Sequence, residues 1–149
     1  MNHTVDVQYG LEESGLPTAD EFIFWAGTAL HNIDAELELS IRIVDENEAA
    51  HLNETWRDKK GATNVLSFPA EISEEIQPRT LGDVVICAPI IAREAIEQGK
   101  SIDDHWAHMV IHGTLHLLGY DHIEAQEIKK MESLEIKLLN QLNIDNPYN

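Results

Sequence analysis

The sequence is poor in cysteine, in basic residues and in long apolar runs. Its 149 residues include one cysteine, Cys87, which cannot form a disulfide within the chain and is expected to be a buried thiol of a cytoplasmic protein. The longest nearly uninterrupted apolar run, 84–92, contains Pro89 and is about half the roughly 20 residues that a membrane span needs. The N-terminal residues lack the basic and then apolar pattern of a secretion signal. We therefore expect a soluble protein with no membrane partner.

Positive charge is scarce. Ten lysines and arginines stand against 27 aspartates and glutamates, which gives a formal net charge of −17. Indiscriminate binding to nucleic acid depends on basic side chains that displace counterions from phosphate, so the composition argues against it. Three of the ten basic residues nevertheless fall within four positions, at Arg57, Lys59 and Lys60. A local basic surface on an acidic protein is compatible with this distribution.

Length and hydrophobic patterning predict one domain, residues 1–149, of the α+β class. The stretch 37–43 alternates apolar and polar residues as a half-buried strand does, whereas 82–88 is almost wholly apolar and indicates a strand covered on both faces. Pro69 suggests an edge strand or a strand end. We expect a small mixed four-stranded sheet flanked by helices. The predicted strands are 5–9, 37–43, 65–69 and 82–88, and the predicted helices are 18–32, 45–56, 89–98, 101–118 and a long one that begins after 122.

Three of the eight histidines lie within eleven residues, at His112, His116 and His122. Histidines four apart on a helix are neighbours, so both imidazoles can reach one ion at the roughly 2.0–2.1 Å of zinc–nitrogen bonds. On a continuous helix His122 would lie about 15 Å along the axis from His112, so the helix must end before it. Gly119 is suited to that end because glycine adopts left-handed backbone angles at no steric cost. The spacing predicts a three-histidine metal site on a helix of the C-terminal half and the turn after it.

Three neutral imidazoles leave the fourth tetrahedral position open, which in zinc proteins is typical of catalytic sites. Bound zinc can lower the pKa of water to about 7 and polarise a phosphoryl or carbonyl oxygen, so we expect one Zn²⁺ ion and a metal-dependent hydrolase. Imidazole also binds nickel, copper and iron, and the sequence leaves these metals open. His108, one turn before His112, and Asp121, next to His122, are weaker candidates for a catalytic role, against structural roles in the helix and the turn.

The same histidine and glycine spacing occurs in metzincin proteases, where a glutamate directly follows the first histidine and acts as general base. Gly113 occupies that position in this chain. A protease would therefore lack its expected proton acceptor, and this interpretation is kept only as an alternative.

The stretch His-Gly-Thr-Leu-His-Leu-Leu-Gly-Tyr-Asp-His at 112–122 resembles the signature of the YbeY family of bacterial endoribonucleases, also called rRNA maturation factors. Two further blocks match, one at 52–57 leading into 63–69 and one at 81–87, so the resemblance covers nearly the whole chain in the same order. Trp56 stands where the family often has tyrosine, and Ala62 where it often has proline.

The resemblance implies a cytoplasmic, zinc-dependent, single-strand endoribonuclease of small-subunit ribosomal RNA maturation and ribosome quality control. Its partners would be ribosomal RNA, the ribosome and ribosome-assembly proteins. By matching positions, the implied zinc ligands are His112, His116 and His122. Arg57 would be the functional arginine, since a planar guanidinium suits a phosphate on which charge develops, and Lys59 and Lys60 are candidate contacts to backbone phosphates. A third interpretation, favoured by the acidic composition, is a metal-containing assembly factor that binds the ribosome without cutting RNA.

Overall fold

The computed structural model describes residues 3–12, 14–70, 78–120 and 124–148. Its elements follow in the order β1 (Thr4–Tyr9), α1 (Ala19–Leu30), β2 (Leu37–Val44), α2 (Glu46–Arg57), β3 (Val65–Pro69), β4 (Arg79–Cys87), α3 (Ala88–Gln98), α4 (Ile102–Leu117) and α5 (Ala125–Gln141). Among the helices of these residues, none is long and apolar enough to cross a membrane.

The four strands form a mixed sheet in the order β1-β2-β4-β3. β1 pairs with β2 and β2 with β4 in parallel, so that Val7 lies opposite Ile41 and Ile41 opposite Val84. β3 pairs with β4 antiparallel and forms one edge of the sheet, where Pro69 removes no interior hydrogen bond. The predicted α+β class, with a small mixed four-stranded sheet flanked by helices, is confirmed.

Local signals in the sequence set several helix ends. The amide of Glu21 donates to Thr18 Oγ1 at 3.2 Å and the Thr18 amide donates to Glu21 Oε1 at 3.0 Å, which is the reciprocal capping box at the start of α1. The predicted end of α2 is wrong by one residue, because Arg57 belongs to the helix and not to the loop. Asp58 adopts left-handed backbone angles with φ 54° and ends the helix there.

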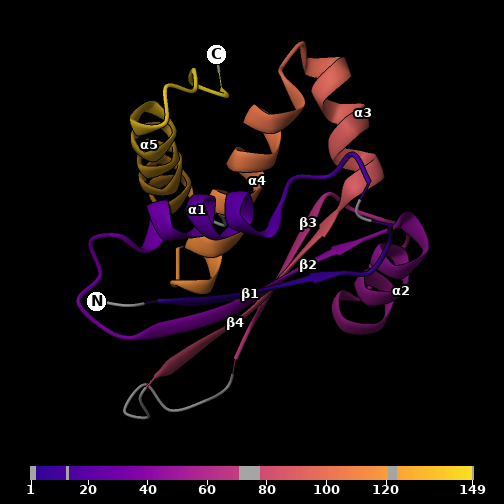
Figure 1. Ribbon diagram of the computed structural model, residues 1–149, viewed down its shortest axis with the longest axis horizontal. Coiled ribbons are helices and arrows are strands. Elements are labelled where there is room, and N and C mark those ends of the chain that lie inside the picture. The colour runs from indigo at the N-terminus through magenta and orange to yellow at the C-terminus, as the bar shows by residue number, and fades with distance from the viewer. Residues whose placement is uncertain (1–2, 13, 71–77, 121–123, 149) are drawn as a thin grey trace.

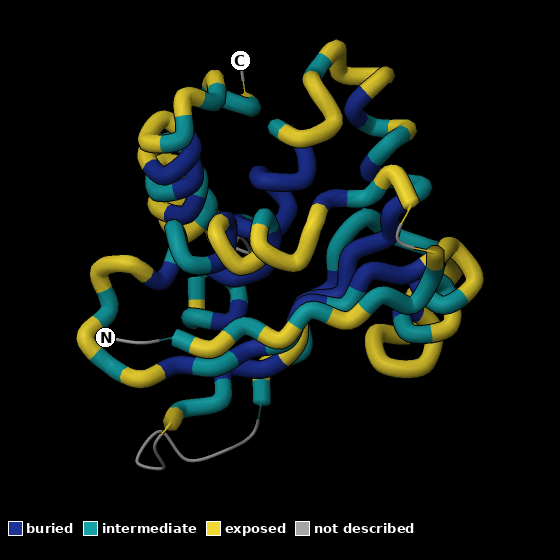
Figure 2. The backbone as a smooth tube through the Cα atoms, in the orientation of Figure 1, coloured by how far each residue is buried: buried dark blue, intermediate teal, exposed yellow. Residues whose placement is uncertain are grey.

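The two faces of the sheet are covered differently (Figure 1). α1 and α4 cover one face, where Ile41 and Val84 join the larger core, and α5 packs on α4. α2 covers part of the other face and forms a smaller core with Val85, Leu66 and Cys87, whose thiol is buried as predicted. Figure 2 shows α4 as the most continuously buried helix, with most of its residues in the buried class.

Gly113 lets α4 approach the sheet closely. A Cβ atom at this position would lie 2.6 Å from Val84 Cγ1 and 3.3 Å from Val65 Cγ2, both distances shorter than ordinary contact. Ser67 Oγ in β3 donates to the Gly113 carbonyl at 3.1 Å. The middle of α4, with the histidines on either side of Gly113, is therefore held against the β3 edge of the sheet.

Candidate metal and phosphate site

A cavity of about 720 Å³ opens where α4, β3 and the end of α2 meet. It unites side chains from three separate parts of the chain. Its lining residues are Asn53, Arg57, Lys59, Thr63, Asn64, Val65, Ser67, Pro69, His112, His116, Gly119 and Tyr120. Two predicted metal ligands and two predicted phosphate contacts thus share one cavity, although more than fifty residues separate them along the sequence.

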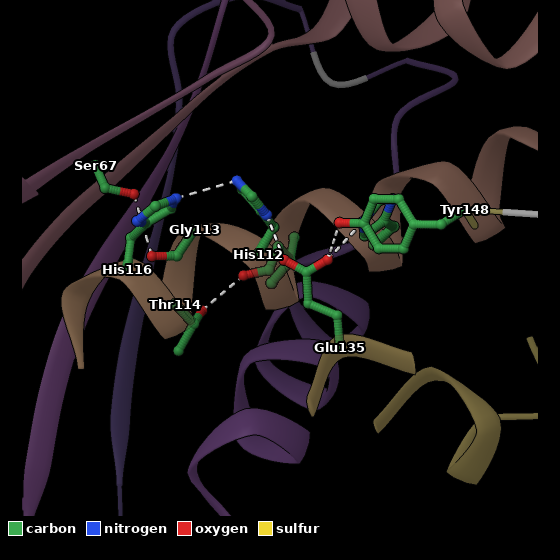
Figure 3. Close-up of polar contacts among 9 residues, drawn as sticks. Ser67, His112, Gly113, Thr114, His116, Glu135 and Tyr148 are labelled. Atoms are coloured by element: carbon green, nitrogen blue, oxygen red, sulfur yellow. Dashed lines mark hydrogen bonds and ion pairs between the residues drawn. The ribbon is translucent and has the colours of Figure 1, made fainter. Parts of the chain in front are cut away.

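His112 and His116 present the same ring nitrogen toward each other. Their Nε2 atoms are 3.1 Å apart, one helical turn along α4 (Figure 3). A tetrahedral zinc ion with bonds of about 2.0–2.1 Å separates two ligand nitrogens by about 3.3–3.4 Å, so this pair fits one ion. The helix ends as predicted, since Leu118 is its C-cap and Gly119 has φ 103°. The predicted third ligand, His122, and the candidate Asp121 lie outside the described residues.

The other nitrogen of His112 faces a buried carboxylate. Glu135 of α5 has no solvent exposure, and its Oε1 forms a short hydrogen bond with His112 Nδ1. Its Oε2 lies 3.1 Å from His108 Nε2 and accepts a short hydrogen bond from the Tyr148 hydroxyl. Figure 3 shows His112 between His116 on one side and Glu135 on the other. One carboxylate therefore connects α4, α5 and the residues after α5.

The charge state of Glu135 determines the direction of these hydrogen bonds. Burial alone would raise the pKa of its carboxyl, but hydrogen bonds from His108, His112 and the Tyr148 hydroxyl outweigh burial and lower that pKa to about 2. Burial and the hydrogen bond to Glu135 raise the pKa of Tyr148, so its hydroxyl keeps its proton. An ionised Glu135 only accepts hydrogen bonds, hence His112 carries its proton on Nδ1 and directs the Nε2 lone pair toward the cavity.

His108, His112 and Glu135 form a second group that could hold a metal ion, since one ligand atom from each lies within 4.8 Å of the others. This group shares His112 with the cavity pair but is closed to solvent at Glu135. An ion placed there would replace the hydrogen bonds that Glu135 accepts, whereas an ion between His112 and His116 would leave them in place. The cavity side is also the side that a substrate can reach.

Asn53 fixes the turn that follows Arg57. Its buried side-chain Nδ2 donates to the Gly61 carbonyl at 2.9 Å, and its backbone carbonyl accepts from the amides of Asp58 and of Lys59, the latter at 3.3 Å. Arg57 and Lys59 are exposed on the cavity wall that this turn forms. Lys60 is exposed as well, but it is not among the described residues that line the cavity.

Sequence patterns missed Glu135 and Tyr148 and left the role of His108 open. His108 is buried beside Glu135 and lies away from the cavity, so it contacts the site through that carboxylate. A signal for Glu135 was present, because it follows Met131 by four residues and precedes Leu138 by three on the apolar stripe of α5. A charged residue in such a stripe is buried and needs a partner.

The fold and the cavity together define an α+β protein in which two histidines of a central helix and an arginine from another helix converge on one opening. The profile of the family described as Endoribonuclease YbeY matches residues 15–143. A protein named Endoribonuclease YbeY from Pseudomonas savastanoi pv. phaseolicola (strain 1448A / Race 6) is 53% identical over 145 residues, which are 97% of this chain and 87% of that relative. The chain belongs to the YbeY endoribonuclease family, as its motifs predicted.

A solved structure shares the fold. The solution structure of TM1509 from Thermotoga maritima matches with a TM-score of 0.61 over 97% of this chain and 95% of that one, at 21% sequence identity. At this identity the likeness concerns the arrangement of helices and strands alone.

Proposed function

We propose that this protein is a zinc-dependent endoribonuclease that hydrolyses phosphodiester bonds of single-stranded RNA in small-subunit ribosomal RNA maturation and ribosome quality control. The proposal rests on one observation above all, the convergence of His112, His116 and Arg57 on a single cavity. Membership of the YbeY family supports RNA as the substrate. The cytoplasm as location, and the ribosome and its assembly proteins as partners, follow from the resemblance and belong to the same proposal.

The ion in this proposal is bound by His112, His116 and His122. The Nε2 atoms of the first two are suitably spaced for it, and the Nδ1 hydrogen bond to Glu135 keeps His112 in the tautomer that a metal requires. When bound, zinc supplies Lewis acidity for phosphodiester hydrolysis. Glu135 and His108 are positioning residues, because they act on the site through the ring of His112.

The cavity wall supplies the contacts to RNA. The guanidinium of Arg57 binds nonbridging oxygens of the scissile phosphate and stabilises the negative charge that develops on them. Lys59 attracts a neighbouring backbone phosphate, and Lys60, farther from the cavity, contacts the strand beyond it. Asp121 is our candidate for the group that moves a proton.

A protease of the metzincin type is disfavoured by the packing of α4. The general base of that class would occupy position 113, where even a Cβ atom would meet Val84 Cγ1 at 2.6 Å. A carboxylate side chain therefore has no room there. A binding factor without catalytic activity is the remaining alternative, and it requires an experiment.

Incubating zinc-loaded protein with single-stranded RNA and, separately, with a denatured protein distinguishes the three functions. We expect cuts in RNA only, and we expect them to disappear with a chelator and in the His116→Ala variant, which also controls for contaminating nucleases. Cuts in the protein substrate would identify a protease. If both substrates stayed intact in the presence of bound metal, the protein would be a binding factor, and the nuclease would be refuted.

Elemental analysis of two variants tests the ligand assignment. We expect His116→Ala to lose the ion and His108→Asn to retain it, because His116 lines the cavity and His108 does not. If His116→Ala retained the ion and His108→Asn lost it, the metal would be held by the group around Glu135 instead.

A further inference from the structure

A second cavity, of about 730 Å³, lies next to the first. Pro69 lines both cavities, and α2 contributes consecutive residues to them, Arg57 to the first and Trp56 to the second. Their Cα atoms are only about 3.8 Å apart, but consecutive side chains of a helix point in different directions, and these two reach different cavities. The edge strand β3 lies between the two cavities and contributes Val65 and Ser67 to the first, Phe68 to the second and Pro69 to both, so an RNA strand that passes around this edge can reach both.

Trp56 gives this second cavity an aromatic wall. Its side chain is 69% exposed, whereas Trp25 and Trp106 are 7% and 1% exposed and belong to the core. Aromatic rings exposed beside a phosphate-binding groove are stacking platforms in proteins that bind single-stranded nucleic acid. Stacking of one base there corresponds to about 5- to 150-fold in affinity.

The floor of the second cavity is the part of the sheet face that α2 leaves open, and its polar groups contact one another. Arg42 Nε lies 2.5 Å and its Nη2 3.1 Å from the two carboxylate oxygens of Glu48, and Ser40 donates a short hydrogen bond to Asp83. The acidic groups disfavour a phosphate but offer acceptors to the amino groups on base edges. The polarity of this floor suits an uncharged, planar and polar ligand.

We propose that the second cavity binds a base of single-stranded RNA, stacked on Trp56, from a nucleotide next to the phosphate held by Arg57. This subsite rests on the proposed function, because it assumes that RNA enters the first cavity. It provides contact area that does not depend on charge, which matters for a protein whose net charge of −17 opposes RNA.

Binding of short RNA to Trp56 variants tests the subsite. Metal-depleted protein is titrated with single-stranded oligonucleotides in which an abasic site is moved through successive positions, and affinity is measured by anisotropy of a labelled RNA. We expect Trp56→Ala to weaken binding about tenfold and Trp56→Phe to retain most of the affinity. Phe24→Ala is the matched control, because Phe24 is also an exposed aromatic, at 60%, and lines neither cavity.

The decisive comparison combines the protein variant with the RNA variant. At one position the abasic site should weaken binding to the unmodified protein about tenfold and have no further effect on Trp56→Ala. Equal abasic penalties in both proteins at every position, or unchanged affinity of Trp56→Ala, would overturn the subsite. Cleavage assayed in parallel with zinc-loaded protein keeps the two proposals separate, because base stacking without cleavage would refute only the nuclease, and cleavage without stacking only the subsite.

Discussion

The two nitrogens of the His112 ring face regions of opposite character. The Nδ1 side is closed, with Glu135 fully buried among His108 and Tyr148. The Nε2 side is open, with His116 at the edge of a cavity and Arg57 exposed on its wall. Packing of α4 against α5 determines the closed side, whereas the end of α2 and the turn after it form the open side.

The closed side can hold the His112 ring in place, and the open side can bind a substrate. On the closed side Glu135 and His108 are buried and Tyr148 is 44% exposed, and hydrogen bonds to Glu135 hold these groups together, so they can keep the His112 ring in one orientation at little entropic cost. Groups on the open side stay in contact with water and can meet a substrate. Apart from the metal ligand His116 itself, substitutions on the two sides should therefore differ in what they change, namely metal affinity and stability on the closed side and RNA cleavage on the open side.

Charge reversal on the open side should have the largest effect. We expect Arg57→Glu to reduce RNA cleavage by about 10³-fold or more while zinc content and the free energy of unfolding stay unchanged, because the side chain is exposed and acts on phosphate. Initial cleavage rates, elemental analysis and urea unfolding measure the three quantities. Lys129→Glu, an equal charge change at an exposed position of α5, serves as control. Cleavage at the normal rate would remove Arg57 from the mechanism.

Removing the negative charge of Glu135, on the closed side, should weaken metal binding. We expect Glu135→Gln to weaken zinc binding about 10- to 100-fold, because an amide accepts more weakly from His112 Nδ1 and its NH₂ group would face donors. Competition with a chromophoric chelator measures this affinity. Glu127→Gln, at an exposed position of the same helix, controls for charge. Unchanged affinity would mean that the buried carboxylate does not position the ligand.

The sequence predicted the parts of this comparison that are local. The alternation at 37–43 and the helix predicted at 89–98 each depend on neighbours in the chain, and each lies in the structure within one residue of the expected bounds. The end of α2 was misplaced because its last turn is polar and has no apolar periodicity, so that only the backbone angles of Asp58 reveal it.

In the candidate site, too, the sequence predicted local contacts and missed contacts between separate helices. His112 and His116 are one helical turn apart, and their spacing alone predicts that their rings meet. The contact of His112 with Glu135 joins residues 23 positions apart on different helices, and that of His108 with Tyr148 joins residues 40 apart. Such pairs depend on how α5 packs on α4, which periodicity does not specify.

A substitution at Gly113 tests whether the close contact between α4 and the sheet holds the helix that carries His112 and His116. We expect Gly113→Ala to destabilise the protein by about 1–3 kcal/mol, because its Cβ would overlap Val84 and push the helix from the sheet. Urea unfolding with and without zinc measures the loss. Gly27→Ala, in α1, where a Cβ meets nothing within 4 Å, is the control and should be neutral or slightly stabilising. Equal stability of both variants would show that α4 shifts freely, and that the histidines are not held by this contact.

Removing one hydroxyl from the closed side should have the smallest effect. Tyr148→Phe deletes a donor to Glu135 but leaves His108 and His112 as donors. The aromatic ring can keep its edge-on contact with His108, in which the two ring centroids are 5.6 Å apart. We expect a loss of about 1 kcal/mol in the free energy of unfolding and only a few-fold weaker zinc binding. A loss of zinc affinity as large as that of Glu135→Gln would contradict the assignment of His112 positioning to the packed helices. The orientation of His112 would then depend on the residues after α5 as much as on the packed helices, since Tyr148 reaches Glu135 from outside both α4 and α5.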